Sequence, residues 1–342
     1  MVTLPEVATL WIGGQLSWLE QLCLKSFADA GHRITLYSYS PIDNIPPGVI
    51  AGNAEDIYPG TPMLRHVRTG SPAINADMWR LHLLAKTDAI WVDADMYCYR
   101  PFDCDKPHVF GWEKPGQVCN AVLGLPRNSP ALLGLLDFFK DEYAIAPWLK
   151  PAQRKELRRE QDAGAPVHMT AQNWGFTGPA SVTHFLMQTG EIEHAEPVEA
   201  FYPVGFPDRN KMILSRHNDW VDAHITPQTR GVHFWARRMK PRLEERENNS
   251  PRRGSFMDTL LKKHGIDPTT ALIPVKRKPQ DDKLNIPDFQ AMIGLEALKS
   301  DISIDKLCRE HLVEKQFVKR CRDTIAERSV TLFASPDSPE NH

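Results

Sequence analysis

Two aspartates separated by one residue, Asp93 and Asp95, follow the short apolar run 89–92. In an extended segment, side chains at positions i and i+2 point to the same face. Two carboxylates on one face at the end of a strand form a hard oxygen site for Mg²⁺ or Mn²⁺. Such an ion can neutralise charge on a diphosphate leaving group. Alone, the D-x-D pattern is a weak signal, because aspartate pairs are also common in turns.

A second polar pair lies upstream of these aspartates. Asp77 and Arg80 are three residues apart in a segment expected to be helical, so they share one helix face. A local ion pair, worth about 0.2–0.5 kcal/mol, is the simpler interpretation. Yet this helix leads directly into the strand before Asp93. An arginine there can hold phosphate or sugar oxygens through paired hydrogen bonds.

The elements that must position these residues alternate between strand and helix. Strands are expected at 7–12, 33–39 and 89–92, and helices at 17–30 and from Ser71-Pro72 to about Ala85. This order predicts an α/β fold with a mainly parallel central sheet. Ligands in such sheets bind at the carboxyl ends of strands. Both Gly13-Gly14 and the aspartate pair follow such strand ends.

Later elements are expected as helices at 131–143, at 151–161 and from Gly178-Pro179 to Leu186, and as a short strand at 232–235. The helix at 151–161 is highly charged, which is typical of a solvated surface. Residues 230–253 contain eight Arg or Lys against three Glu. A mobile, solvated loop is the favoured interpretation of this basic run. An anionic substrate or a membrane surface is the alternative partner for it.

The composition excludes several classes of protein. The chain has 342 residues and a net charge of −2, with 42% hydrophobic and 25% charged residues, which excludes collagen, wholesale disorder and a disulfide-dense miniprotein. The balanced charge argues against a general nucleic-acid binder. No apolar run approaches the roughly 18 residues of a membrane helix, so no transmembrane segment is predicted. Residues 1–14 lack a signal peptide's basic start, and the six cysteines form no C-x-x-C pair, so cytoplasmic localisation with reduced thiols is expected.

Four segments, in order, resemble glycosyltransferase family 32. Asn75-Ala-Asp77-Met-Trp-Arg80, followed by Asp93-Ala-Asp95, is similar to the family's donor-site block and to the catalytic domain of the large clostridial glucosylating toxins. The others are Leu10-Trp11-Ile12-Gly13-Gly14, Thr177-Gly178-Pro179 with Thr183, and His233-Phe234-Trp235. Together they span about residues 5–240. One departure, Thr87-Asp88 where relatives often have Gly-Gly, changes a turn and no ligand.

The resemblance implies a GT-A fold that binds a nucleotide-diphosphate sugar and Mn²⁺ or Mg²⁺. The residues it implies are Asp93, Asp95 and His233 for the metal; Asp93, Asp95 and Arg80 for catalysis; and Trp11, Ile12, Gly13, Asp77, Arg80, Asp93, Ala94 and Asn173 for the donor. Trp11 would stack on the nucleobase, and Asn173 with Trp174 would face the acceptor side. A core tryptophan and a structural histidine are the alternative roles for Trp11 and His233.

The implied reaction is the retaining transfer of a hexose or N-acetylhexosamine. The donor is expected to be a UDP-sugar, and the acceptor a glycan, a lipid-linked glycan or a protein, as in polysaccharide biosynthesis. No obvious nucleophile stands out, so same-face attack assisted by the leaving phosphate is favoured over a covalent carboxylate intermediate. A haloacid-dehalogenase-type phosphatase is the enzymatic alternative, but it usually has Thr or Val where this chain has Tyr97. A non-catalytic sensor of sugar nucleotides is the other alternative.

The C-terminal part has a different character. A transferase domain at 1–273, a linker at 274–285, an all-α module at 286–333 and a disordered tail at 334–342 are expected. Residues 288–299 and 302–328 are similar to the helix-turn-helix of insertion-sequence transposases. Leu312 replaces the turn glycine of that motif, and Cys321 replaces an aromatic residue. Acidic residues outnumber basic ones over 279–342, so packing or a protein partner is favoured over DNA.

Overall fold

The computed structural model describes residues 4–102, 106–173, 175–274, 284, 286–299, 302–311 and 313–329. By its internal contacts the chain divides into two compact units. Residues 1–66 and 72–275 form the first unit, and residues 67–71 and 276–342 form the second. Nearly all of the linker predicted at 274–285 and the whole tail predicted at 334–342 lie outside the described residues.

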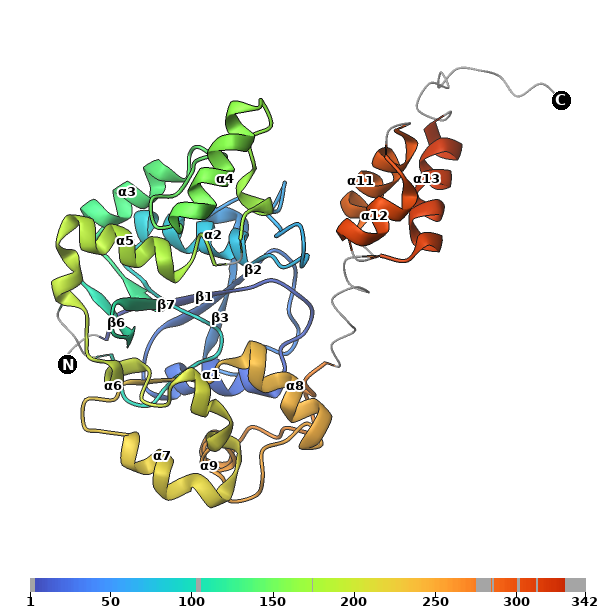
Figure 1. Ribbon diagram of the computed structural model, residues 1–342. Helices are drawn as coiled ribbons and strands as arrows, with labels where there is room; N and C mark the ends of the chain where they lie inside the picture. Colours follow the sequence, from blue (N-terminus) through green and yellow to red (C-terminus); the bar gives the residue numbers. More distant parts are fainter. Residues whose placement is uncertain are drawn as a thin grey trace. The chain divides into compact units, whose positions relative to one another are not determined.

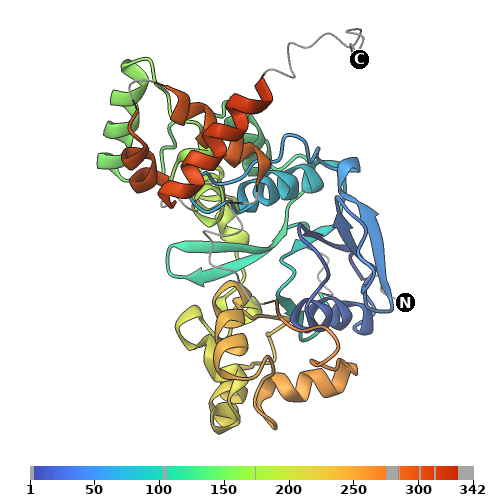
Figure 2. The ribbon, with the colours of Figure 1, turned by 90° about the vertical axis from the view of Figure 1, so that its right-hand side faces the viewer.

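A six-stranded sheet runs through the first unit in the order β3-β2-β1-β4-β7-β6 (Figure 1). The strands are β1 (Val7–Trp11), β2 (Ile34–Ser38), β3 (Val49–Asn53), β4 (Ile90–Val92), β6 (Val109–Lys114) and β7 (Gln117–Gly124). Strands β1 to β4 are parallel to one another. Strand β7 pairs antiparallel with both β4 and β6, and β6 and β7 form the hairpin seen in Figure 2. This confirms the α/β class with a mainly parallel sheet and agrees with the expected GT-A arrangement.

Helices cover both faces of this sheet, because both faces are apolar. The helices of the first unit are α1 (Trp18–Asp29), α2 (Ala73–Lys86), α3 (Pro130–Phe138), α4 (Pro151–Asp162), α5 (Pro179–Thr189), α6 (Val198–Phe201), α7 (Asn218–His224), α8 (Ala236–Arg246) and α9 (Phe256–His264). Figure 1 shows α2, α3 and α5 on one face and α1 on the other. Leu81, Trp91 and Leu135 belong to the core under α2 and α3, and Phe27 and Ile34 to the core under α1.

The helices expected from the sequence are present, with shifts of a few residues at their ends. Helix α2 starts one residue late, so Pro72 is its N-cap rather than its first residue. Helix α3 ends at Phe138, five residues short of the predicted 143. The basic run 230–253 is not a mobile loop, because α8 occupies its centre. Met239 and Leu243, one turn apart, are fully buried and anchor that helix.

The described residues of the second unit form the helices α11 (Pro287–Leu298), α12 (Ile304–His311) and α13 (Lys315–Ser329). Its core contains Phe289, Ile293, Leu307, Val313, Phe317, Val318 and Cys321. A Cβ atom at Gly294 would lie 2.6 Å from the carbonyl oxygen of Cys321, so α11 approaches α13 too closely for any other residue. Leu312, the turn position of the predicted motif, lies outside the described residues.

Within the part of the chain that the structure describes, every helix is too short or too polar to cross a bilayer.

Buried His32 links the stability of the first unit to pH. Its Nδ1 lies 2.9 Å from the carbonyl oxygen of Pro5, and the backbone N–H of Phe102 donates to its Nε2 at 2.9 Å. Because Nε2 accepts, the ring is neutral, and burial lowers the pKa of His32 below its ordinary 6.5. Below pH 6.5, His32 therefore binds a proton in the unfolded chain but stays neutral in the folded chain. The free energy of unfolding falls as the pH drops through that value.

We expect His32→Gln to remove part of this acid sensitivity. The contribution of one histidine is at most about 1.4 kcal/mol per pH unit. Urea unfolding of both proteins between about pH 5 and pH 8 measures it. An unchanged slope of stability against pH in the variant would contradict the assignment.

Candidate active site

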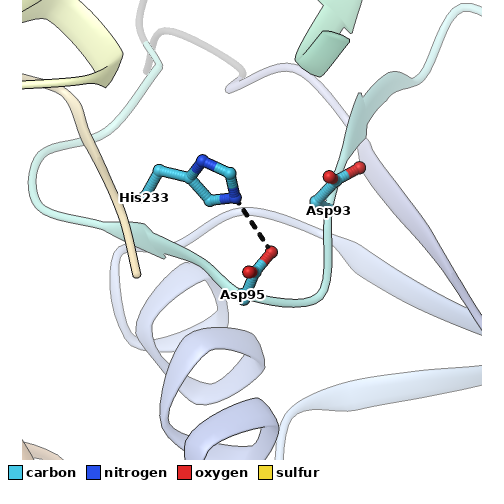
Figure 3. Close-up of side chains that lie close together, drawn as sticks. All are labelled: Asp93, Asp95 and His233. Carbon is cyan, nitrogen blue, oxygen red and sulfur yellow. Dashed lines mark hydrogen bonds and ion pairs between the residues drawn. The ribbon is translucent and has the colours of Figure 1, made fainter. Parts of the chain in front are cut away.

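The aspartate pair occupies a tight turn. Asp93, Ala94 and Asp95 connect β4 to β5 (Met96–Cys98), and the backbone N–H of Met96 donates to the carbonyl oxygen of Asp93 at 2.9 Å. The expectation of an extended segment with both side chains on one face is therefore wrong. The turn nevertheless lies at the carboxyl end of β4, as expected. It places both carboxylates near His233, and the Asp95 carboxylate points at the imidazole ring (Figure 3).

A two-stranded ladder brings His233 to these aspartates. Strand β8 (Gly231–His233) pairs antiparallel with β5, with Met96 opposite His233. The Nε2 atom of His233 lies 3.2 Å from Oδ1 of Asp95. One ligand atom from each of Asp93, Asp95 and His233 falls within 4.8 Å of the others. Residues 138 positions apart therefore form one group.

The other carboxylate oxygen of Asp95 binds the start of α8. The backbone N–H of Ala236 donates to Asp95 Oδ2 at 2.7 Å. The chain enters this helix through Trp235, which has φ 54° and ψ 43°, a left-handed conformation that a bulky residue rarely adopts. A hydrogen bond of 3.0 Å from Trp235 Nε1 to the carbonyl oxygen of Val204 holds it there. Backbone strain of this kind is common at functional sites.

The charges of this group favour a bound cation. Burial alone would raise the pKa of Asp95, but His233, the Ala236 N–H and Lys240 outweigh it and lower that pKa to about 2. Burial raises the pKa of Asp93. Burial alone would lower the pKa of His233, but Asp95 and Asp93 outweigh it and raise that pKa. The two carboxylates thus attract positive charge to the imidazole.

The donor atoms suit a divalent metal ion. Two carboxylates and one imidazole form an oxygen-rich set of the kind that Mn²⁺ accepts, and Mg²⁺ prefers oxygen ligands alone. The Nδ1 atom of His233 is buried without a hydrogen-bond partner, so no described group fixes the ring from behind. Asp93, Asp95 and His233 are therefore the residues that would hold the ion.

Arg80 links Asp93, one of the three candidate metal ligands, to the carboxylate of Asp77. Its Nη2 lies 3.3 Å from Oδ1 of Asp93 and 3.5 Å from Oδ1 of Asp77, and its Nη1 donates to the carbonyl oxygen of Asn120 at 2.8 Å. Arg80 is only 6% exposed, and its guanidinium lies 4.6 Å from the ring centroid of Trp91. The predicted sharing of one helix face by Asp77 and Arg80 is confirmed. The local ion pair is also present, but it is part of a larger buried network.

Further hydrogen bonds hold both carboxylates of this network. Thr177 Oγ1 donates to Asp77 Oδ2 at 2.6 Å, and Asn120 Nδ2 lies 3.4 Å from Asp77 Oδ1. Trp91 Nε1 donates to Asp93 Oδ1 at 2.8 Å. Burial raises the pKa of Asp77, although Arg80 and the Thr177 hydrogen bond oppose the shift. Asp77 and Asp93 are thus fixed in position before any ligand binds.

A cavity of about 180 Å³ opens over this network. Its polar lining is Asp77, Arg80, Asp93, Asn120, Asn173, Thr177 and His66, and its apolar lining includes Ile74, Met169 and Phe176. A pocket with several converging polar groups on an apolar base is typical of a small-molecule site. Asn173 therefore lines the same cavity as Asp77 and Asp93. Its neighbour Trp174 lies outside the described residues.

The predicted nucleobase residues lie at the end of β1. Trp11 is half-buried against the core, and its Nε1 donates to the carbonyl oxygen of Gly14 at 2.8 Å. Ile12 packs on the opposite core, so its side chain serves the fold. Gly13 is exposed in the turn that follows. Because β1 and β4 are parallel neighbours, Trp11 and Asp93 share one edge of the sheet.

Sequence reasoning missed Asn120 and the N–H of Ala236. A polar residue within the apolar strand 117–124 is an unusual feature and points to Asn120, whose side chain is 6% exposed. No pattern in the sequence identifies a backbone N–H as the partner of Asp95. Lys240 was noticed only as one member of the basic run, although its charge reaches Asp95.

Comparison with known proteins gives little further information. No protein-family model matches the chain, and no curated protein matches it. Among the solved structures similar to it is the PaToxG glycosyltransferase, with 15% sequence identity and a TM-score of 0.37, over 54% of this chain and 69% of that chain.

Proposed function

We propose that the chain is a metal-dependent glycosyltransferase that uses a nucleotide-diphosphate sugar. The observation that carries this proposal is one continuous arrangement at the carboxyl edge of the sheet. The cation-attracting group of Asp93, Asp95 and His233 adjoins a polar cavity through Asp93, which belongs to both and pairs with Arg80 in the cavity wall. A cation held by this group would neutralise a diphosphate, and the polar cavity would bind the hydroxyl groups of a sugar.

Each part of this arrangement has a chemical task. A bound divalent ion supplies charge stabilisation to the diphosphate as it leaves. Arg80, held by Asp77, Asp93 and the carbonyl oxygen of Asn120, adds a fixed positive charge at the junction with the sugar cavity. Preorganised charges of this kind stabilise a transition state without having to rearrange. Asp77 would accept hydrogen bonds from sugar hydroxyl groups. Asn173 could both accept such bonds and donate them.

The proposed transfer retains the anomeric configuration, through same-face attack. Among the described residues lining the cavity, the carboxylates are Asp77 and Asp93. Asp77 accepts a hydrogen bond from Thr177, Asp93 accepts one from Trp91, and Arg80 lies between them. Neither is poised as a nucleophile. A glycosyl adduct trapped on either aspartate would overturn this route and leave the transferase proposal intact.

The reaction class is tested with a donor panel. The protein is incubated with Mn²⁺ and nucleotide-diphosphate sugars that carry hexose or N-acetylhexosamine, with UDP-sugars first, and release of nucleoside diphosphate is measured. We expect metal-dependent release from one donor, with glycan, lipid-linked and protein acceptors screened afterwards. A donor that raises the melting temperature without any release would favour a sugar-nucleotide sensor instead. No release and no thermal shift with any donor would refute the proposal.

A further inference from the structure

Helix α8 carries Lys240, a largely buried lysine that pairs with a carboxylate on another helix. Lys240 Nζ forms an ion pair with Oε1 of Glu20, on α1. The side chain of Glu20 is 2% exposed and that of Lys240 is 14% exposed, so the pair is largely sheltered from water. The same ammonium group lies 5.3 Å from the ring centroid of Trp11. Lys240 is therefore a partly buried cation beside Trp11, a predicted ligand-binding residue.

Glu20 accounts for only part of what Lys240 can bind. The other oxygen of Glu20 accepts from the backbone N–H of Ser17 at 3.1 Å and from Ser17 Oγ at 2.6 Å, which fixes the carboxylate at the start of α1. A lysine ammonium has three N–H donors, and Glu20 takes one of them. The ammonium is therefore held in place by an anchored partner and retains capacity for another acceptor.

Helix α8 places Lys240 one turn beyond the residue that binds Asp95. Ala236 and Lys240 are four residues apart on α8, so they lie on the same face of the helix. The N–H of Ala236 binds Asp95 Oδ2 at the start of that face. One turn further on, Lys240 reaches Trp11. Its positive charge thus lies beside the predicted base-stacking residue and also acts on the predicted metal ligand, Asp95.

We propose that Lys240 recognises the phosphate groups of the donor nucleotide. The inference rests on the proposed function: with a base at Trp11 and a diphosphate at Asp95, the phosphate chain would come within reach of an ammonium group that lies 5.3 Å from the Trp11 ring and whose charge acts on Asp95. The ammonium donates to a phosphate oxygen there while Glu20 continues to orient it. Lys240 thereby selects nucleotides over nucleosides, and Glu20 lowers its affinity for phosphate by competing for it.

Calorimetric titration with UDP and Mn²⁺ tests the assignment, with uridine as the matched probe that lacks phosphate. Lys240→Met alone would leave a buried carboxylate unpaired and risks misfolding. The informative variant is therefore the double change Glu20→Gln with Lys240→Met, which removes both charges and keeps both volumes. Glu20→Gln alone keeps the lysine. Arg246→Met, which removes an exposed cation from the last turn of the same helix, is the control for net charge.

The double variant and Glu20→Gln alone should differ in their affinity for UDP. The double variant should bind UDP about 10-fold to 100-fold more weakly, the range for one charge-assisted hydrogen bond, with uridine unaffected. Glu20→Gln alone should bind UDP as tightly as the unaltered protein or more tightly. Arg246→Met should be unchanged.

Three outcomes would overturn the inference. They are unchanged UDP binding by the double variant, an equal loss in Glu20→Gln alone, or an equal loss for uridine; the last two would mean that the pair only holds Trp11 or α8 in place. If no nucleoside diphosphate binds to the unaltered protein with Mn²⁺, the proposed function itself fails, which is a distinguishable result.

Discussion

Asp95→Asn should lower donor cleavage by about 1,000-fold or more, which corresponds to about 4 kcal/mol of transition-state stabilisation. Asparagine has the same shape and keeps an oxygen for the N–H of Ala236, so the turn and the start of α8 are preserved. What it loses is the negative charge that draws a cation to Asp93 and His233. Release of nucleoside diphosphate and titration with Mn²⁺ should both show the loss.

The matched control is Asp88→Asn. Asp88 precedes β4, its side chain is 86% exposed, and it pairs with Arg127 at the surface. Exposed pairs contribute little to stability, so this variant should behave as the unaltered protein does. If Asp95→Asn retained metal-dependent cleavage within a few-fold of the unaltered protein, Asp95 would not be a metal ligand. The assignment of the group would then have to be abandoned.

Arg80→Lys should reduce donor cleavage by about 100-fold, because one ammonium cannot reproduce the contacts of the guanidinium. Arg80 reaches Asp77, Asp93 and the carbonyl oxygen of Asn120 with two nitrogens, and it stacks over Trp91. Lysine keeps a positive charge near the two buried carboxylates. Arg80→Met removes that charge as well, and breaking a buried ion pair costs about 3–5 kcal/mol.

The two substitutions separate catalysis from folding. Urea unfolding should show a modest loss of stability for Arg80→Lys and a severe one for Arg80→Met, and cleavage should be poor in both. Arg127→Lys, at an exposed ion pair, is the control and should change neither quantity. An Arg80→Lys variant that is stable and fully active would show that Arg80 contributes only its charge to the fold.

Sequence alone indicated the parts of the molecule that local rules govern. Helical spacing and Pro179 located α1, α2 and α5, and the alternation of strand and helix predicted β1, β2 and β4, whereas the parallel strand β3 was not expected. The pairing of Asp77 with Arg80 followed from helix geometry, because residues three apart on a helix are always neighbours. The place of Asp93 at the carboxyl end of a buried strand was equally local.

Other features depended on contacts between distant segments. The tight turn at Asp93–Asp95 depends on β5 leaving the main sheet to pair with β8, a choice that the residues of the turn do not encode. The basic run 230–253 is rich in charges and so predicts a solvated loop, yet α8 forms there and buries Ala236, Met239 and Leu243 in the core.

The tertiary structure alone decided which residues meet at the site. His233 reaches Asp95 across 138 residues, Thr177 reaches Asp77 across 100, and Lys240 pairs with Glu20 from a separate helix. Periodicity describes neighbours within one element, whereas these meetings are set by the hydrophobic cores that dock one element on another. The sequence by itself determined what chemistry the residues offer, and the packing of β8, α5 and α8 around β4 determined that they offer it in one place.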